Sequence, residues 1–143
     1  MTAKRLLRLV AYRERLEGLQ EAVLARAVQR QAERRAALAA SASARATLIA
    51  TEVPEGTLDP FAFHIAGIYL RALDRQVEAR QSALAHSDLE VQQERERLLE
   101  RRRNRKAMDS LLQRRLAEAR EERNRGAIAQ LDEQARVRWL RSR

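Results

Sequence analysis

Large apolar residues recur every seven positions in the second half of the chain. The members of this line are Leu70, Val77, Leu84, Val91, Leu98 and Leu112, and Arg105 interrupts it. A seven-residue repeat keeps one line of side chains facing a partner helix, so it predicts a coiled-coil helix. The line offset by three residues is apolar only at its ends and reads Leu73, Arg80, Ser87, Glu94, Arg101 and Met108. We therefore expect this helix to pair with another through a seam whose middle is weak or hydrated.

The first half of the chain has the spacing of an amphipathic helix. Apolar residues lie three and four positions apart from Leu6 to Val28, and the stripe continues mostly through alanine from Ala36 to Ala46. This pattern predicts a first helix over about residues 4–50.

A break separates the two helical halves. Pro54 favours an extended residue before it and a tight turn, so we predict a turn over residues 51–58. Asp59 is a good helix cap and Pro60 suits the first helical position. A second helix is therefore predicted from residue 60 to about residue 125 or beyond.

Two long helices joined by one turn predict an all-α fold. We expect an antiparallel coiled-coil hairpin whose second helix is the longer, with residues 1–143 forming a single coiled-coil domain. If the turn is centred near residue 54 or 55, two residues face each other across the hairpin when their numbers sum to about 109. The alanines around Ala42 then face Gly67 and its bulky neighbours. In this register residues 109–143 form a C-terminal overhang whose apolar positions nothing in the chain covers.

The composition fits long helices and gives no sign of enzyme chemistry. Only 3% of the 143 residues are aromatic, 34% are charged, and there is no Cys, which excludes disulfides and thiolate metal sites. His64 and His86 lack partners at metal-binding spacing, and no phosphate loop or acid–base pair is present. We therefore expect no catalytic residue, no metal and no cofactor, and we do not expect an enzyme.

The net charge of +9 is concentrated toward the C-terminus. Residues 95–143 hold 16 basic and 8 acidic residues, whereas residues 59–94 hold 3 and 6. Such a distribution would steer the C-terminal part toward an acidic surface. The best apolar stretch, Phe61 to Leu73, is too short to span a membrane, and the N-terminus lacks the apolar core of a signal peptide. We expect the protein to stay where it is made, without direct membrane insertion.

Two C-terminal features each allow a functional and a structural interpretation. The basic run from Arg95 to Lys106 could neutralise phosphates, but glutamates are interleaved with it at salt-bridging spacing. A nucleic-acid partner is therefore not our expectation. Trp139 could be a binding anchor or a residue that packs locally.

The C-terminal half resembles the end of the FliJ family. The residues that carry the resemblance are Arg105-Lys106-Ala107-Met108-Asp109, Leu111, Arg114-Arg115 and Leu131-Asp132-Glu133-Gln134-Ala135-Arg136. Members of this family are small flagellar type III export proteins, and they have YscO-like counterparts in virulence secretion. Family members have the same length, the same break near a third of the chain and the same long basic second helix.

This resemblance implies a function and a set of contacts. Family members form an antiparallel coiled coil similar to the central stalk of rotary ATPases. Their free helix ends enter the pore of the hexameric export ATPase, and they link this ATPase to the export gate, a membrane protein. Export chaperones are further candidate partners. The implied location is cytoplasmic, peripheral at the cytoplasmic face of the export apparatus.

The resemblance also points to particular residues. The implied ATPase-binding residues are Leu6, Leu9, Arg114, Arg115, Arg120 and Arg123. The family's gate-contacting strip is aromatic, Leu, Ala and His at spacings of four, three and four; its positions are occupied here by Tyr69, Leu73, Gln76 and Arg80. The last two depart from the family pattern.

Two other functions stay open at this point. A generic coiled-coil scaffold would dimerise through the C-terminal overhang and need no ATPase. A basic helical protein that binds nucleic acid is the third hypothesis, and its signature would be strongly salt-dependent binding.

Overall fold

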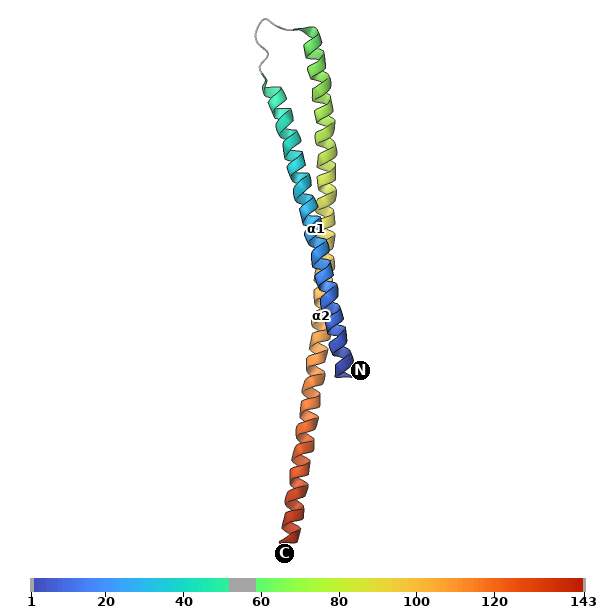
Figure 1. The fold of residues 1–143 in the computed structure, drawn as a ribbon, viewed down its shortest axis with the longest axis vertical. Coiled ribbons are helices and arrows are strands. Elements are labelled where there is room, and N and C mark those ends of the chain that lie inside the picture. Colours follow the sequence, from blue (N-terminus) through green and yellow to red (C-terminus); the bar gives the residue numbers. More distant parts are fainter. Residues whose placement is uncertain (1, 52–58, 143) are drawn as a thin grey trace. The chain divides into compact units, whose positions relative to one another are not determined.

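The protein folds as two long helices. The computed structural model describes residues 2–51 and 59–142, and Figure 1 shows its ribbon. Helix α1 spans Ala3–Ala50 and helix α2 spans Pro60–Arg141. The two run antiparallel and pack against each other as a hairpin, with α2 the longer, which confirms the predicted fold class. The predicted turn lies, apart from Thr51, outside the described residues.

Helix α2 begins as its sequence predicts. The Asp59 carboxylate accepts a hydrogen bond from the backbone N–H of Phe61 at 3.0 Å, and the Asp59 carbonyl accepts one from the N–H of Phe63 at 3.0 Å. Pro60 occupies the first helical position, where its missing N–H costs nothing. The capping residue and the proline together set the start of the helix.

The hairpin consists of two compact units, each containing a piece of both helices. Unit 1 is formed by residues 1–18 and 99–143, and unit 2 by residues 19–98. Charge is divided unevenly between them: unit 1 has 19 basic and 9 acidic residues, and unit 2 has 10 and 11. The basic character of the chain therefore belongs to unit 1.

The seam of unit 2 is built from alternating apolar and polar layers. Its buried residues are Ala27, Leu73, Val91, Leu98, Gln20, Ser41, Ser87 and Glu94. The buried polar side chains bond across the helix pair; for example, the Gln20 amide donates to the Glu94 carboxylate. Among the described residues, no buried side-chain nitrogen or oxygen lacks a hydrogen-bond partner. The polar seam is as predicted, and its buried side chains find hydrogen-bond partners across the helix pair. The weakness or hydration of its middle stays a prediction.

Two of these layers mirror each other. The Arg34 guanidinium of α1 donates to Ser87 Oγ and to the Ala83 carbonyl, the latter at 3.1 Å. The Arg80 guanidinium of α2 donates in the same way to Ser41 Oγ and to the Ala37 carbonyl, the latter at 2.5 Å. A serine is small enough to let an arginine from the facing helix reach the backbone carbonyl one turn earlier. Each helix thus supplies one arginine and one serine site.

These cross-helix bonds correct the predicted register. The pairs Arg45–Asp74, Arg80–Ser41 and Arg34–Ser87 join residues whose numbers sum to about 120, not about 109. The reason is that turn chemistry locates the chain reversal but not the length of the connection on each side of it.

The expected packing of large residues on alanines was wrong for Ala42 and for both phenylalanines, whereas Tyr69 does line a depression together with Ala40 and Ala44. Ala42 is exposed, and Phe61 and Phe63 are about 70% exposed. The seam is instead fixed by the polar layers, which lie further from the turn.

Unit 1 pairs the start of α1 with the middle of α2. Leu6 and Leu112 are buried, at 3% and 5% exposure. Glu17 Oε2 accepts a hydrogen bond from Arg105 Nε at 2.6 Å, so the arginine that interrupts the apolar line is itself a seam residue. The register shift extends the covered part of α2: its exposed stretch begins at Arg120 and, in the part that the structure describes, continues to Ser142, with Val137 half-buried.

Candidate partner-binding surfaces

The C-terminal segment, residues 120–142, is the largest uncovered part of unit 1. Its apolar residues Ile128, Leu131 and Trp139 are 54–64% exposed. With Ala135 they follow spacings of three and four, so they share one face of α2. Two of the flanking arginines make local ion pairs, Arg125 with Glu121 at 3.5 Å and Arg136 with Glu133 at 3.9 Å. Solvent-exposed ion pairs of this kind contribute little free energy, so the arginines can exchange them for contacts with a partner.

The predicted ATPase-binding residues all lie in unit 1, but they differ in exposure. Leu6 is buried and Leu9 is half-buried, whereas the four arginines are exposed. Arg115 pairs with Glu118 at 3.0 Å, and Arg123 Nε donates to the Ala119 carbonyl at 3.1 Å. Leu6 packs within the helix pair, so any partner contact from it would be indirect.

Glu17 ties the start of α1 to α2. It accepts hydrogen bonds from Arg105 at 2.6 Å and from Arg102 at 3.3 Å. The hydrogen bond from Arg105 lowers the pKa of Glu17, and the same bond raises the pKa of Arg105. This cluster holds the first turns of α1 beside the segment that leads to the C-terminal surface.

The predicted gate strip lies along the edge of the seam in unit 2. Tyr69 is 56% exposed and Gln76 is exposed, whereas Leu73 is 6% exposed and Arg80 bonds to α1. Tyr69 borders a shallow depression of about 610 Å³ whose other walls come from α1 and the residue after it: Ala40, Ser43, Ala44, Thr47, Leu48 and Thr51. The structure therefore leaves two of the four residues for a partner and uses the other two in its own seam.

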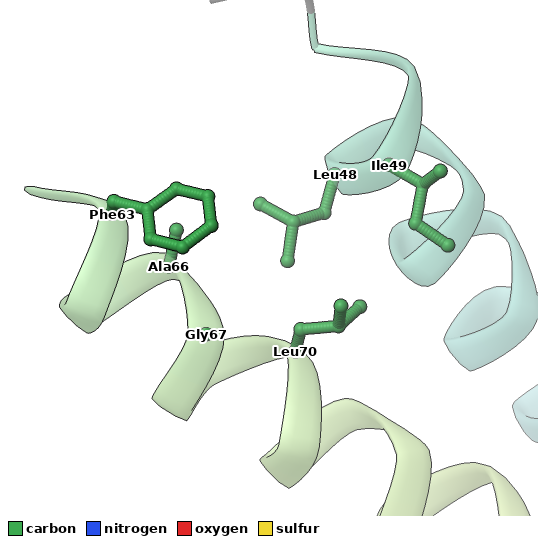
Figure 2. A pocket seen from close by; sticks show the side chains of 6 residues that line it. All are labelled: Leu48, Ile49, Phe63, Ala66, Gly67 and Leu70. Carbon is green, nitrogen blue, oxygen red and sulfur yellow. The ribbon is translucent and has the colours of Figure 1, made fainter. Parts of the chain in front are cut away.

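An apolar pocket of about 220 Å³ lies near the ends of α1 and α2 in unit 2. Figure 2 shows Leu48 projecting from α1 toward the space between Phe63 and Leu70 of α2. Ile49, Ala66 and Gly67 complete the lining, which contains no charged side chain. A Cβ atom added at Gly67 would meet nothing within 4 Å, so the glycine is not required by close packing.

The described residues offer no metal or membrane-spanning site. No group of three or more His, Asp or Glu side chains in residues 2–51 and 59–142 could hold a metal ion. Neither helix, within the part that the structure describes, is long and apolar enough to cross a membrane.

A model of the family described as Flagellar FliJ protein matches residues 2–143. The chain belongs to the FliJ family. No curated protein and no solved structure matches the chain. The family match covers both helices, so it includes both units and each of the surfaces above.

Sequence reasoning missed one surface of this FliJ-family chain. Phe61, Ile65 and Ile68 lie at spacings of four and three and are 70%, 49% and 47% exposed. They are among the bulky neighbours of Gly67 that the predicted register places opposite the alanines around Ala42. Their direction on the helix could have distinguished them from residues of the seam. At 100° per residue they point away from the line that contains Leu70 and Val77.

Proposed function

We propose that this chain is a non-enzymatic central-stalk and adaptor protein of a type III export apparatus. It inserts its helix ends into the hexameric export ATPase and links the ATPase to the export gate. Membership of the FliJ family supports the coarser part of this proposal, a component of flagellar type III protein export. The cytoplasmic location, at the cytoplasmic face of the apparatus, is proposed on the same ground.

The observation that carries the ATPase contact is the exposed C-terminal segment. An uncovered apolar stripe flanked by arginines suits a partner with an acidic rim and an apolar interior. Unit 1 carries the excess of basic residues, which would attract such a partner at long range. The start of α1 lies in the same unit, so one partner could contact both helix ends.

The proposed ATPase contact is tested by charge reversal with a matched control. Replacing Arg114, Arg115, Arg120 and Arg123 by Glu should weaken binding to the purified ATPase at least tenfold at low salt. The control reverses four exposed arginines of unit 2 by the same amount: Arg26, Arg35, Arg71 and Arg75. Binding should then change by less than threefold. Equal losses in both variants would mean that only net charge matters, and unchanged affinity in the first would refute the assignment.

The gate contact is proposed for the exposed part of the strip, Tyr69 and Gln76. Tyr69 stands beside the depression lined by α1, where an apolar side chain of the gate protein could be covered on two sides. Changing Tyr69 to Ala should reduce binding to the cytoplasmic domain of the gate protein. Tyr12, which is 57% exposed in unit 1, gives the matched control, and Tyr12→Ala should bind normally. Normal binding of Tyr69→Ala would remove this residue from the gate contact.

A further inference from the structure

The first turns of α2 are apolar on every side. Between Phe61 and Leu70 the chain has no charged residue, and its only polar side chains are His64 and Tyr69. One face, with Phe63, Ala66 and Leu70, borders the pocket beside α1. A helix that is hydrophobic all round is normally buried. Here, among the described residues, α1 borders the pocket face and Tyr69, whereas side chains on the opposite face are 47–70% exposed.

The opposite face forms the outer stripe, which we define as Phe61, Ile65 and Ile68. These side chains are 70%, 49% and 47% exposed, and Tyr69 beside them is 56% exposed. Together the four expose roughly 400 Å² of accessible surface. This is less than the roughly 800 Å² per partner of a standard interface, and it lies in the range of weak, transient contacts.

We propose that the outer stripe pairs with the same stripe of a second copy of the chain, antiparallel and centred on Ile65. The surface formed by the outer stripe and Tyr69 is nearly symmetric about Ile65, because Phe61 and Tyr69 lie four positions to either side of it. Each surface can therefore serve as its own complement, which a two-fold interface requires. This inference does not depend on the proposed function.

Charge favours a second copy at this place. Two chains of charge +9 repel each other, but unit 2 has 10 basic and 11 acidic residues and is close to neutral. Within residues 59–71 the only charged residues are Asp59 and Arg71. Both lie six positions from Ile65, which at 100° per residue is about 120° away from the outer stripe, so an antiparallel pairing centred on Ile65 brings no like charges together.

The experiment is analytical ultracentrifugation of the full chain with a charge swap at the two-fold residue. The wild type should form a dimer with a dissociation constant on the order of 10–100 µM, as expected for so small an interface. Ile65→Glu and Ile65→Lys should each raise this constant at least tenfold, because like charges would face each other. An equimolar mixture of the two variants should dimerise at least tenfold more tightly than either alone. Ile65 is half-exposed, so neither change disrupts the seam.

The matched control lies on the other uncovered apolar surface. Ile128 is 59% exposed in unit 1, and Ile128→Glu should leave the dimer constant within twofold of the wild type. A wild type that stays monomeric throughout this concentration range would overturn the proposal. Loss of the dimer in Ile128→Glu but not in Ile65→Glu would also overturn it and assign self-association to the C-terminal segment. Failure of the mixture to associate would overturn the two-fold pairing.

Discussion

Leu111 and Leu112 are neighbours in α2 that lie in opposite surroundings. Leu112 is 5% exposed, whereas Leu111 is 45% exposed. Changing Leu112 to Ala removes three carbons from the seam of unit 1, at about 0.8 kcal/mol each, so we expect a loss of about 2 kcal/mol in the free energy of unfolding. The cavity term should be small, since a two-helix seam is open on both sides and its neighbours can close in. Leu111→Ala should cost about 1 kcal/mol or less.

Both variants would be measured by urea unfolding followed by circular dichroism. Faster amide hydrogen exchange over residues 3–18 would show that the lost stability belongs to the part of α1 in unit 1. The comparison tests the register directly. If residues whose numbers sum to about 109 faced each other, nothing in α1 would lie opposite Leu112, and the two substitutions would have similar effects. Equal destabilisation by Leu111→Ala and Leu112→Ala would therefore refute the observed pairing.

Three further predictions follow from single features of the helix pair. Arg34→Ala should lower the free energy of unfolding by about 1–2 kcal/mol, because it removes two hydrogen bonds to α2. Arg35 is exposed, so Arg35→Ala should lower it by under about 0.5 kcal/mol. Equal losses in urea unfolding would contradict a stabilising role of the layer formed by Arg34 and Ser87. The pKa of Glu17 is lowered from 4.5 in the folded chain, so the stabilisation that its carboxylate gives is fully present above pH 4.5 and is lost as the pH falls through the lowered pKa. Glu17→Gln should flatten this part of the plot of unfolding free energy against pH, and an unchanged plot would contradict the role of Glu17. Gly67→Ala should raise the melting temperature, since a Cβ there meets nothing within 4 Å and alanine favours the helix by about 1 kcal/mol; a lower melting temperature would count against it.

Local signals in the sequence predicted the helices well. The seven-residue line from Leu70 to Leu112, the Asp59-Pro60 start and the alanine-rich continuation of the first helix depend on neighbouring residues only. They gave the fold class; the bounds of α1, Ala3–Ala50, and the start of α2 at Pro60 lie close to the predicted ones, and α2 continues past residue 125 to Arg141. The number of domains stays a prediction.

The register could not be read from such signals. It depends on which arginine of one helix meets which serine of the other, and many pairings of Arg34 or Arg80 satisfy a pattern of small and polar residues equally well. The same limit applies to Arg105, which interrupts the apolar line in the sequence but lies in the seam of the structure. Its partner Glu17 is distant in sequence, so neighbouring residues do not indicate the pairing.

The candidate sites were predicted unevenly for a related reason. The exposed arginines and Tyr69 lie where a partner could meet them, but Leu6, Leu73 and Arg80 are used by the helix pair itself. A family motif fixes residue positions and not their burial, which depends on the register. The same error hid the outer stripe of Phe61, Ile65 and Ile68, because the incorrect register supplied it with alanine neighbours.

The most direct test of the proposed function is a titration of this protein into the purified hexameric export ATPase of the same cells. Co-sedimentation would measure binding, and phosphate release would measure ATP hydrolysis. The stalk proposal predicts saturable binding that weakens with salt, together with a change in the hydrolysis rate that a chain lacking residues 120–143 does not produce. Absence of both binding and any change in hydrolysis at low salt would contradict the proposal.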